Sequence, residues 1–183
     1  MIDKKTKLTI AVVNAQEMQV YGHQIARVHA AAFGTGEEGA IRYERESLPG
    51  MTCMPGFIAS IAQRDDEIAG FACGHEAAPH QPWASRVFAA LAAQGFEDWT
   101  RDTFEFADIV VHPDVQGQGI GRLLLDAVIA KVSHRYCILV TYNGPHAAKR
   151  LYLRAGWVTL VEDFRYRIGS PFTSIMGLDR SAI

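Results

Sequence analysis

The sequence predicts one mixed α/β domain, in which helices flank a sheet that carries a parallel strand pair. The first observation is the strand, helix, strand order over residues 103–142, because such a crossover joins parallel neighbours. The second is a pair of apolar runs around four charged residues, which is typical of an antiparallel hairpin. The third is length: 183 residues fit a single domain. We therefore treat residues 1–183 as one domain.

The first half of the chain predicts a strand, two helices and the hairpin. A β-rich run opens it, apolar residues at helical spacing follow, and Pro49-Gly50 is expected to end the second helix. The predicted elements are the strand Leu8–Val13, the helices Glu17–Phe33 and Glu37–Leu48, and the hairpin strands Phe57–Ala62 and Ile68–Cys73.

The second half begins with an interruption over residues 76–103, which carries a helix-like piece at Ser85–Ala93. A strongly patterned region follows, in which an apolar run without alternation indicates a strand covered on both faces. The predicted elements are the strand Thr103–Val111, the helix Gln116–Val132, the strand Tyr136–Tyr142, the helix Pro145–Ala155, and strands near Val158–Glu162, Arg165–Ile168 and Thr173–Leu178.

Composition excludes several classes of protein. The net charge of −2 disfavours a nucleic-acid binder, and no apolar run reaches the ~18 residues of a membrane span. The segment Met1–Lys5 lacks the apolar stretch of a signal peptide. Cys53, Cys73 and Cys137 are far apart and odd in number, so we expect reduced thiols and no metal site. We expect a cytoplasmic protein without nucleic-acid or membrane partners, and leave a homodimer open.

The charges are distributed unevenly along the chain. Residues 114–157 carry a net charge of +4, and the rest of the chain carries −6. Such an imbalance favours an anionic ligand in the first region, although charged stretches are usually just solvated faces.

The most informative segment is a glycine-rich turn, Gln116-Gly117-Gln118-Gly119-Ile120-Gly121-Arg122, between a strand and an amphipathic helix. Free N–H groups at a helix start, together with the helix dipole, favour anions, and glycines let a phosphate approach the backbone. A P-loop fails because Arg122-Leu123 stand where Lys and Ser or Thr are needed. A dinucleotide fingerprint fails because its third glycine is missing.

The pattern Q-x-x-G-x-G, formed by Gln116, Gly119 and Gly121, resembles the GNAT superfamily of acetyl-CoA-dependent N-acetyltransferases. A second match, Ala148-x-x-x-Tyr152-x-x-x-Gly156-Trp157, resembles a later segment of the same family. The resemblance covers roughly residues 103–157. It implies a mixed, mostly antiparallel sheet with a central splayed parallel pair, and it marks residues 76–103 as a family-variable insertion.

By this resemblance the cosubstrate is acetyl-CoA. Residues 116–122 are implied to hold the pyrophosphate, namely Gln116, Gly117, Gln118, Gly119, Ile120, Gly121 and Arg122. The strand residues Ile109, Val110 and Val111 are implied to bind the pantetheine arm through their backbone, with Ala148 nearby. The family's usual asparagine falls on Pro145 here, so Asn143 is the substitute candidate.

The implied reaction is direct transfer of acetyl to a primary amine. Tyr152 is the candidate acid that protonates the leaving thiolate, and a backbone N–H near Val111 is expected to stabilise the oxyanion. The candidate bases are Glu105 and Asp108 on the strand, and water alone is a third option. No cysteine nucleophile is required.

The acceptor is not identified by the sequence. The family binds it through segments that correspond here to residues 33–48, 77–103 and the tail after 164. Their acidic and aromatic residues slightly favour a small cationic amine. A protein amine acetyltransferase, a non-catalytic acyl-CoA sensor and a nucleotide-binding protein are the alternatives.

Overall fold

The computed structural model describes residues 7–182, and these form a mixed α/β fold with seven strands. The hydrogen-bonded strand order is β1-β2-β3-β4-β5-β7-β6. One pair, β4 with β5, is parallel and the sheet is otherwise mostly antiparallel, which confirms the predicted fold class. The segment Met1–Lys5, used above to argue against a signal peptide, lies outside the described residues.

The contacts divide the chain into two compact units. Unit 1 comprises Met1–His75 and Ala107–Val132, and unit 2 comprises Glu76–Phe106 and Ser133–Ile183. Strand β4 (Thr103–Val111) supplies residues to both units.

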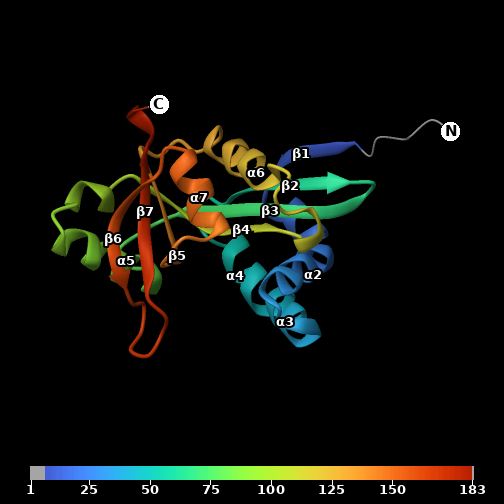
Figure 1. Ribbon diagram of the computed structural model, residues 1–183, viewed down its shortest axis with the longest axis horizontal. Coiled ribbons are helices and arrows are strands. Elements are labelled where there is room, and N and C mark those ends of the chain that lie inside the picture. Colours follow the sequence, from blue (N-terminus) through green and yellow to red (C-terminus); the bar gives the residue numbers. More distant parts are fainter. Residues whose placement is uncertain (1–6, 183) are drawn as a thin grey trace. The chain divides into compact units, whose positions relative to one another are not determined.

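Unit 1 contains the N-terminal helices, the hairpin, and the glycine-rich turn with its helix (Figure 1). Besides part of β4, its strands are β1 (Leu8–Val13), β2 (Ile58–Arg64) and β3 (Glu67–Glu76), although Glu76 itself falls in unit 2. Its α-helices are α1 (Ala15–Val20), α2 (Gly22–Phe33), α3 (Gly36–Arg42), α4 (Leu48–Thr52) and α6 (Ile120–Ile129). It also contains the π-helix η1 (Tyr43–Ser47) and the 3₁₀ turn η3 (Pro113–Val115).

The hairpin prediction is confirmed. Strands β2 and β3 pair antiparallel, and a two-residue turn joins them. Both turn residues have positive φ, 51° at Asp65 and 67° at Asp66, as a type I′ turn requires. Aspartate tolerates this left-handed region better than most residues, which explains the charged sequence of the turn.

The predicted helix Glu17–Phe33 is wrong in its extent, because two helices with a break at Tyr21 replace it. The first begins at Ala15, since the Asn14 side chain accepts from the Glu17 N–H and the Glu17 carboxylate accepts from the Asn14 N–H. This reciprocal capping box fixes the start two residues earlier than apolar spacing alone suggested.

The prediction that Pro49-Gly50 ends the second helix is also wrong. The chain continues from α3 through the π-helix η1 into α4, which ends at Thr52. Pro49 lies in the first turn of α4. A proline is tolerated there because its missing N–H costs least at a helix start.

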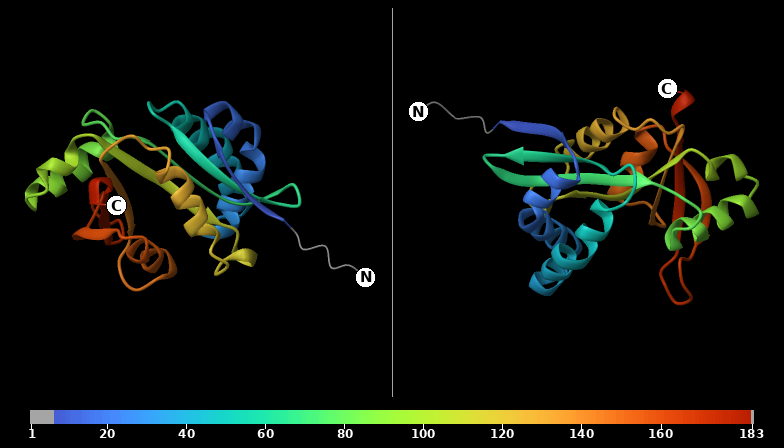
Figure 2. Two further views of the ribbon diagram at one scale, coloured as in Figure 1. Left: turned by 90° about the horizontal axis from the view of Figure 1, so that it is seen from above. Right: turned by 180° about the vertical axis from the view of Figure 1, so that it is seen from behind.

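Two groups of helices cover the hairpin strands of unit 1. The helices before β2 bury one face, with a core that includes Met18, Ile25, Phe71 and Val110. Figure 2 shows α2 and α6 on opposite faces of these strands. On the α6 side, the buried Ser60 hydroxyl donates to the Leu124 carbonyl at 2.9 Å, which ties α6 to β2.

Unit 2 contains the rest of the chain. Its elements, besides part of β4, are the helices α5 (Pro82–Ala93) and α7 (Ala147–Arg154), the strands β5 (Tyr136–Tyr142), β6 (Val158–Phe164) and β7 (Thr173–Asp179), and the 3₁₀ turns η2 (Glu97–Thr100) and η4 (Arg180–Ala182). The parallel register pairs Thr103–Glu105 with Tyr136–Ile138, which confirms the predicted parallel pair.

Other elements also differ from the predictions. No strand forms at Arg165–Ile168, where the described residues turn between β6 and β7. Helix α6 begins at Ile120 rather than Gln116, because the glycine-rich turn precedes it. Helix α7 begins at Ala147 rather than Pro145, and the His146 ring caps it by accepting from the Lys149 N–H.

The predicted insertion, residues 76–103, is part of the core of unit 2. Val87 and Leu91 of α5 belong to one buried cluster with Ile138 and Ile175. The Trp99 ring lies over Gly177 of β7, where a Cβ atom would overlap it. No described helix has the length and apolar character to cross a membrane.

Candidate functional site

The glycine-rich turn of unit 1 exposes its backbone. Residues 116–119 are exposed, and Gly117 and Gly119 have φ of 76° and 82°. No atom lies within 4 Å of the Cβ that either position would carry, so these glycines are set by conformation rather than by crowding. The turn leaves open space in front of the main chain, as an approaching phosphate requires.

The turn leads into the N-terminus of α6, a helix of 10 residues. The N-cap residue Gly119 supplies no side-chain hydrogen bond, so the first N–H groups of α6 are not capped by their own N-cap side chain. Uncapped N–H groups and the positive end of the helix dipole favour an anion at this point. The residues present therefore fit a phosphate-bearing ligand.

Two glutamines of the turn make side-chain contacts inside unit 1. Gln116 donates from Nε2 to the Val111 carbonyl at 3.0 Å, and Gln118 accepts from the Arg64 guanidinium at 2.9 Å. The Gln116 contact fastens the start of the turn to the end of β4. The Gln116 side chain therefore helps to fix the shape of the turn. This structural function is compatible with its predicted place at the pyrophosphate.

Two basic side chains of residues 114–157 are paired within their own units. Arg122 forms two hydrogen bonds to Asp126, at 2.8 and 2.7 Å, one helical turn later. Lys149 contacts Glu162 at 3.0 Å. The positive potential of residues 114–157 is thus partly neutralised in this structure, and a phosphate would compete with these carboxylates.

The end of β4 lies close to β3. A Cβ on Gly70 would come within 2.6 Å of the Val110 carbonyl oxygen, so only glycine fits there. The Val110 side chain is buried at 3% exposure, whereas Ile109 and Val111 are half-buried. The N–H of His112 donates to the Ala69 carbonyl at 2.9 Å, which holds the strand end in place.

Asp108 occupies an unusual environment for a carboxylate. It is half-buried, and the Tyr43 hydroxyl donates to its Oδ2 at 2.8 Å. Burial raises the pKa of Asp108, while the Tyr43 hydrogen bond and the nearby His29 oppose this rise. The carboxylate therefore has more affinity for a proton than an ordinary aspartate, which suits a base.

Glu105, the other candidate base, lies in unit 2. It is buried at 6% exposure, at the position that pairs with Ile138 of β5. An amine substrate would reach a buried carboxylate of this kind less readily than a half-exposed one.

Tyr152, the candidate acid, is buried in unit 2 at 6% exposure. Its ring lies 6.0 Å from the Trp157 ring, and Trp157 in turn makes an edge contact with Phe106 at 5.6 Å. Ala148 precedes it by one helical turn and is half-buried. The tyrosine ring is thus held by packing, which restricts the positions available to its hydroxyl.

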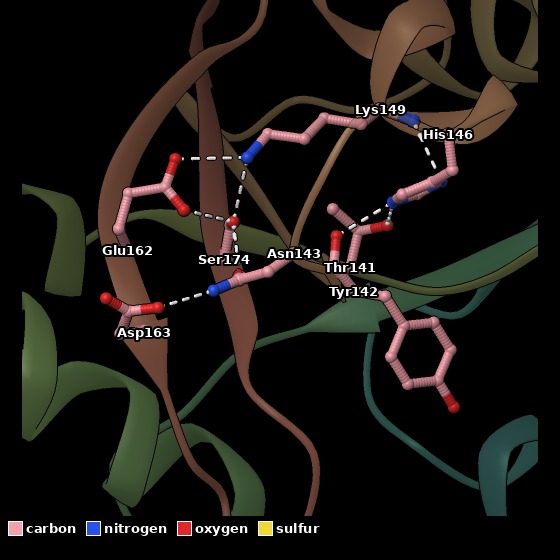
Figure 3. Close-up of polar contacts among 8 residues, drawn as sticks. All are labelled: Thr141, Tyr142, Asn143, His146, Lys149, Glu162, Asp163 and Ser174. Atoms are coloured by element: carbon pink, nitrogen blue, oxygen red, sulfur yellow. Dashed lines mark hydrogen bonds and ion pairs between the residues drawn. The ribbon is translucent and has the colours of Figure 1, made fainter.

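Asn143 belongs to a polar network that joins the β5–α7 loop to β6 and β7 (Figure 3). Its Oδ1 lies 2.8 Å from the Ser174 hydroxyl, and its Nδ2 donates to Asp163 at 2.6 Å. Ser174 lies within hydrogen-bonding distance of Glu162 and Lys149 as well, at 2.7 and 3.0 Å. The Asn143 carboxamide is therefore occupied by protein partners here.

His146 fastens the other end of the same loop. Its Nε2 lies 2.7 Å from the Tyr142 carbonyl and 3.4 Å from the Thr141 hydroxyl, while its Nδ1 caps α7 (Figure 3). The Tyr142 ring points away from this network and is 58% exposed. Together these contacts fix the start of α7, the helix that carries Tyr152.

A hollow of about 800 Å³ lies between α2 and α3 of unit 1. Its walls carry opposite charges, with His23 and Arg27 on α2 and Glu37 and Glu44 farther along the chain. His23 and Glu44 contact each other at 3.2 Å. Within residues 7–182, no group of three His, Cys, Asp or Glu side chains is arranged to hold a metal ion.

Sequence reasoning missed Tyr43 and His29, which surround Asp108. Tyr43 is 65 residues away from Asp108 along the chain, and no motif links the two. Tyr43 falls within the predicted helix Glu37–Leu48, but nothing in the sequence marked it as a site residue. To identify Tyr43 and His29 from the sequence, one would need to know which helix packs beside β4.

The comparisons with known proteins agree on one family. The model of the acetyltransferase (GNAT) family matches residues 25–157. The N-acetyltransferase ycf52 of Gracilaria tenuistipitata var. liui, itself uncharacterised, is 32% identical over 68 residues. That match covers 36% of this chain and 37% of the relative, so the chain spans little more than a third of it.

Solved structures show the same fold. A protein from Desulfovibrio desulfuricans, assigned to the GNAT family, aligns with a TM-score of 0.66 at 20% identity, over 94% of this chain and 99% of its own. The protein yncA of Salmonella typhimurium, solved with its cofactor acetyl-CoA, aligns with a TM-score of 0.60 at 19% identity, over 95% and 94%. The PaiA N-acetyltransferase of Thermoplasma acidophilum, solved with coenzyme A, aligns with a TM-score of 0.60 at 14% identity, over 94% and 99%.

Proposed function

Because this chain belongs to the acetyltransferase (GNAT) family, we propose that it transfers acetyl from acetyl-CoA directly to a primary amine. The observation that carries the proposal is the exposed glycine-rich turn at the uncapped start of α6. A turn of this kind binds phosphate through its backbone, and relatives of the same fold were solved with acetyl-CoA or coenzyme A.

We assign the pyrophosphate to residues 116–122, and the pantetheine arm to the backbone of Ile109 and Val111. Arg122 would exchange its Asp126 partner for a phosphate when the cofactor binds. Asn143 is a weaker candidate, because its carboxamide already bonds Ser174 and Asp163.

The proposed chemistry forms one bond and breaks one. The neutral amine nitrogen bonds to the acetyl carbonyl carbon, and the bond between that carbon and sulfur breaks. Tyr152 donates its hydroxyl proton to the departing thiolate. The proton that the attacking nitrogen loses as the amide forms passes to solvent, and solvent reprotonates Tyr152. A backbone N–H near Val111 donates to the carbonyl oxygen while it carries negative charge.

Asp108 is the better candidate for the base. It takes a proton from the bound ammonium before attack and releases that proton to solvent. Its half-exposed position and its raised pKa support this role, because a base works best with a pKa near the working pH. The buried Glu105 has less access to a substrate.

For the acceptor, we propose a small cationic amine. The hollow of unit 1 supports it, since Glu37 lines it with a carboxylate that an ammonium group can approach, and the amine would compete with His23 for Glu44. A protein amine would need a wider surface and remains the alternative acceptor.

The test is a panel of small amines and peptides with acetyl-CoA, in which free thiol release is followed. We expect release that depends on one class of amine and that falls in Tyr152→Phe. A thermal-shift series with coenzyme A, ATP and NAD accompanies it, since a ligand at 100 times its Kd adds about 2.7 kcal/mol. Stabilisation by coenzyme A without transfer to any amine would favour a sensor instead. Stabilisation by ATP or NAD alone would overturn the family function.

A further inference from the structure

Tyr43 is held in a stack of aromatic rings inside unit 1. Its ring lies 4.0 Å from the His29 ring, nearly parallel at 24°, and 6.1 Å from the Phe71 ring. Its exposure is only 4%, and its hydroxyl reaches Asp108 Oδ2 at 2.8 Å. The hydroxyl is therefore fixed by three elements, α2, η1 and β3, and has little freedom to leave Asp108.

The backbone at Tyr43 is unusual as well. Tyr43 is the first residue of the π-helix η1, which is inserted between α3 and α4. Such π-turns are rare and often accompany functional sites, because the extra residue re-aims a side chain. Here the side chain at this irregular turn is the one that contacts the candidate base.

We infer that Tyr43 and His29 are positioning residues for Asp108: Tyr43 binds one carboxylate oxygen, and the His29 ring keeps Tyr43 in that place. The inference rests on the proposed function, in which Asp108 is the base. The carboxylate oxygen Oδ1 would then face the acceptor amine while Oδ2 is held.

The titratable groups around Asp108 decide which side chain donates the hydrogen bond and which accepts it. The titratable groups that face the pair are His29 from α2, Tyr43 from η1 and Cys73 from β3, which lies beside Tyr43. Burial, and then the charge of Asp108, raise the pKa of Tyr43 far above its ordinary value, so its hydroxyl stays a donor. Burial lowers the pKa of His29, and the charge of Asp108 opposes that shift.

The position of the half-buried His29 ring is otherwise hard to explain. Its Nδ1 is buried and lacks a hydrogen-bond partner among the described residues. Leaving a buried polar atom unpaired is unfavourable. An imidazole at this position therefore has an energetic cost that another contact of the ring must offset. Its flat face against Tyr43 is the contact that the structure provides.

The central experiment titrates the Asp108 carboxyl carbon by ¹³C NMR in the full-length protein. The Asp108→Asn variant assigns its signal. Tyr43→Phe keeps the ring between His29 and Phe71 but removes the hydroxyl that stabilises the charged carboxylate. We expect the pKa of Asp108 to rise by about one to two units in this variant. Tyr21→Phe, which alters another tyrosine packed against the same core, is the matched control and should leave the pKa unchanged.

Two His29 variants separate the ring from its nitrogens. In His29→Phe the stack remains but the electrostatic effect of the imidazole is lost, so the pKa of Asp108 should rise slightly. In His29→Ala the stack is lost as well, Tyr43 is freed, and the pKa should rise further. Equal pKa values of Asp108 in His29→Phe and His29→Ala would show that the His29 ring does not position this pair.

Activity gives a second readout once an acceptor is known. Because the base must be deprotonated, the acid limb of kcat/KM should move to higher pH in Tyr43→Phe by the same amount as the NMR pKa. A Tyr43→Phe variant with an unmoved carboxyl pKa overturns the inference, whatever its stability. If no amine is acetylated, the proposed function fails, and the NMR titration still decides whether Tyr43 and His29 control Asp108.

Discussion

Both units contain carboxylates in polar clusters, yet their surroundings move the pKa values in opposite directions. In unit 1, Asp108 lies among aromatic rings, and burial raises its pKa. In unit 2, hydrogen bonds from Ser174 and Lys149 lower the pKa of Glu162, which is largely exposed. Both residues carry a carboxyl group, and the environment of each group decides whether it keeps or releases its proton at a given pH.

This contrast separates the proposed base from a network of contacts that anchors a loop. The network of Glu162, Ser174, Lys149 and Asn143 satisfies each member with opposite charges or hydrogen bonds, which favours a fixed loop. Asp108 accepts a hydrogen bond from the Tyr43 hydroxyl, and burial disfavours its charge. Groups with perturbed pKa values are common where chemistry occurs.

The largest expected effect comes from removing the carboxylate of each cluster. Asp108→Asn should lower kcat/KM for the amine by about 10²–10⁴-fold, the usual contribution of a general base. Glu162→Gln should leave it nearly unchanged. Thiol-release kinetics with acetyl-CoA measure both, and equal losses in the two variants would erase the proposed distinction.

The next effect concerns stability. Phe71 is fully buried beside Tyr43, so Phe71→Ala should lower the unfolding free energy by about 3–5 kcal/mol. Urea unfolding followed by circular dichroism measures it. A loss below about 1 kcal/mol would mean that the aromatic stack of unit 1 is loosely packed.

The two kinds of carboxylate should also respond to pH with opposite signs. The folded pKa of Asp108 is raised, so folding stability decreases as pH rises from about 4 toward that raised value. The Arg135 hydrogen bond, with Ser181, lowers the pKa of Asp179 to about 2. Its stabilising contribution is present above about pH 4 and is lost as pH falls toward 2.

Unfolding midpoints between pH 2 and 7 test this opposition. Asp108→Asn should reduce the loss of folding stability as pH rises above about 4. Asp179→Asn should reduce the loss of folding stability as pH falls below about 4. Identical pH profiles for both variants and the wild type would contradict the assigned environments.

The smallest effect belongs to the ion pair of unit 2. Lys149 contacts Glu162, whose side chain is 56% exposed, so Lys149→Met should cost about 0–1 kcal/mol. The loss of unfolding free energy should be smaller still in about 0.5–1 M salt, where a Debye length of about 3–4 Å screens the ion pair. A loss above about 2 kcal/mol would show that the network is a major source of stability.

Much of the fold could be predicted because period and turn chemistry are local properties. The strands β1, β4 and β5 have the bounds that their apolar runs indicate, and the Asp65-Asp66 turn explains the hairpin. Errors arose where a side chain far in sequence or a cap decides the outcome. Asn14 moved a helix start, and the π-helix at Tyr43 carried the chain past Pro49.

The candidate site was predictable to a smaller extent. The turn at 116–122 has a motif because phosphate binding needs glycine at fixed positions. The surroundings of Asp108 have none, because Tyr43 and His29 reach it only through tertiary packing. Spacing on the strand nominated both Glu105 and Asp108, and only the environment of each carboxylate separates them.

The contact between Trp99 and Gly177 limits which residues unit 2 accepts on β7. A Cβ at position 177 would overlap the Trp99 ring and lie 2.6 Å from the Leu160 side chain. Even an alanine at 177 would therefore require both neighbours to move, so two separate side chains keep this position a glycine.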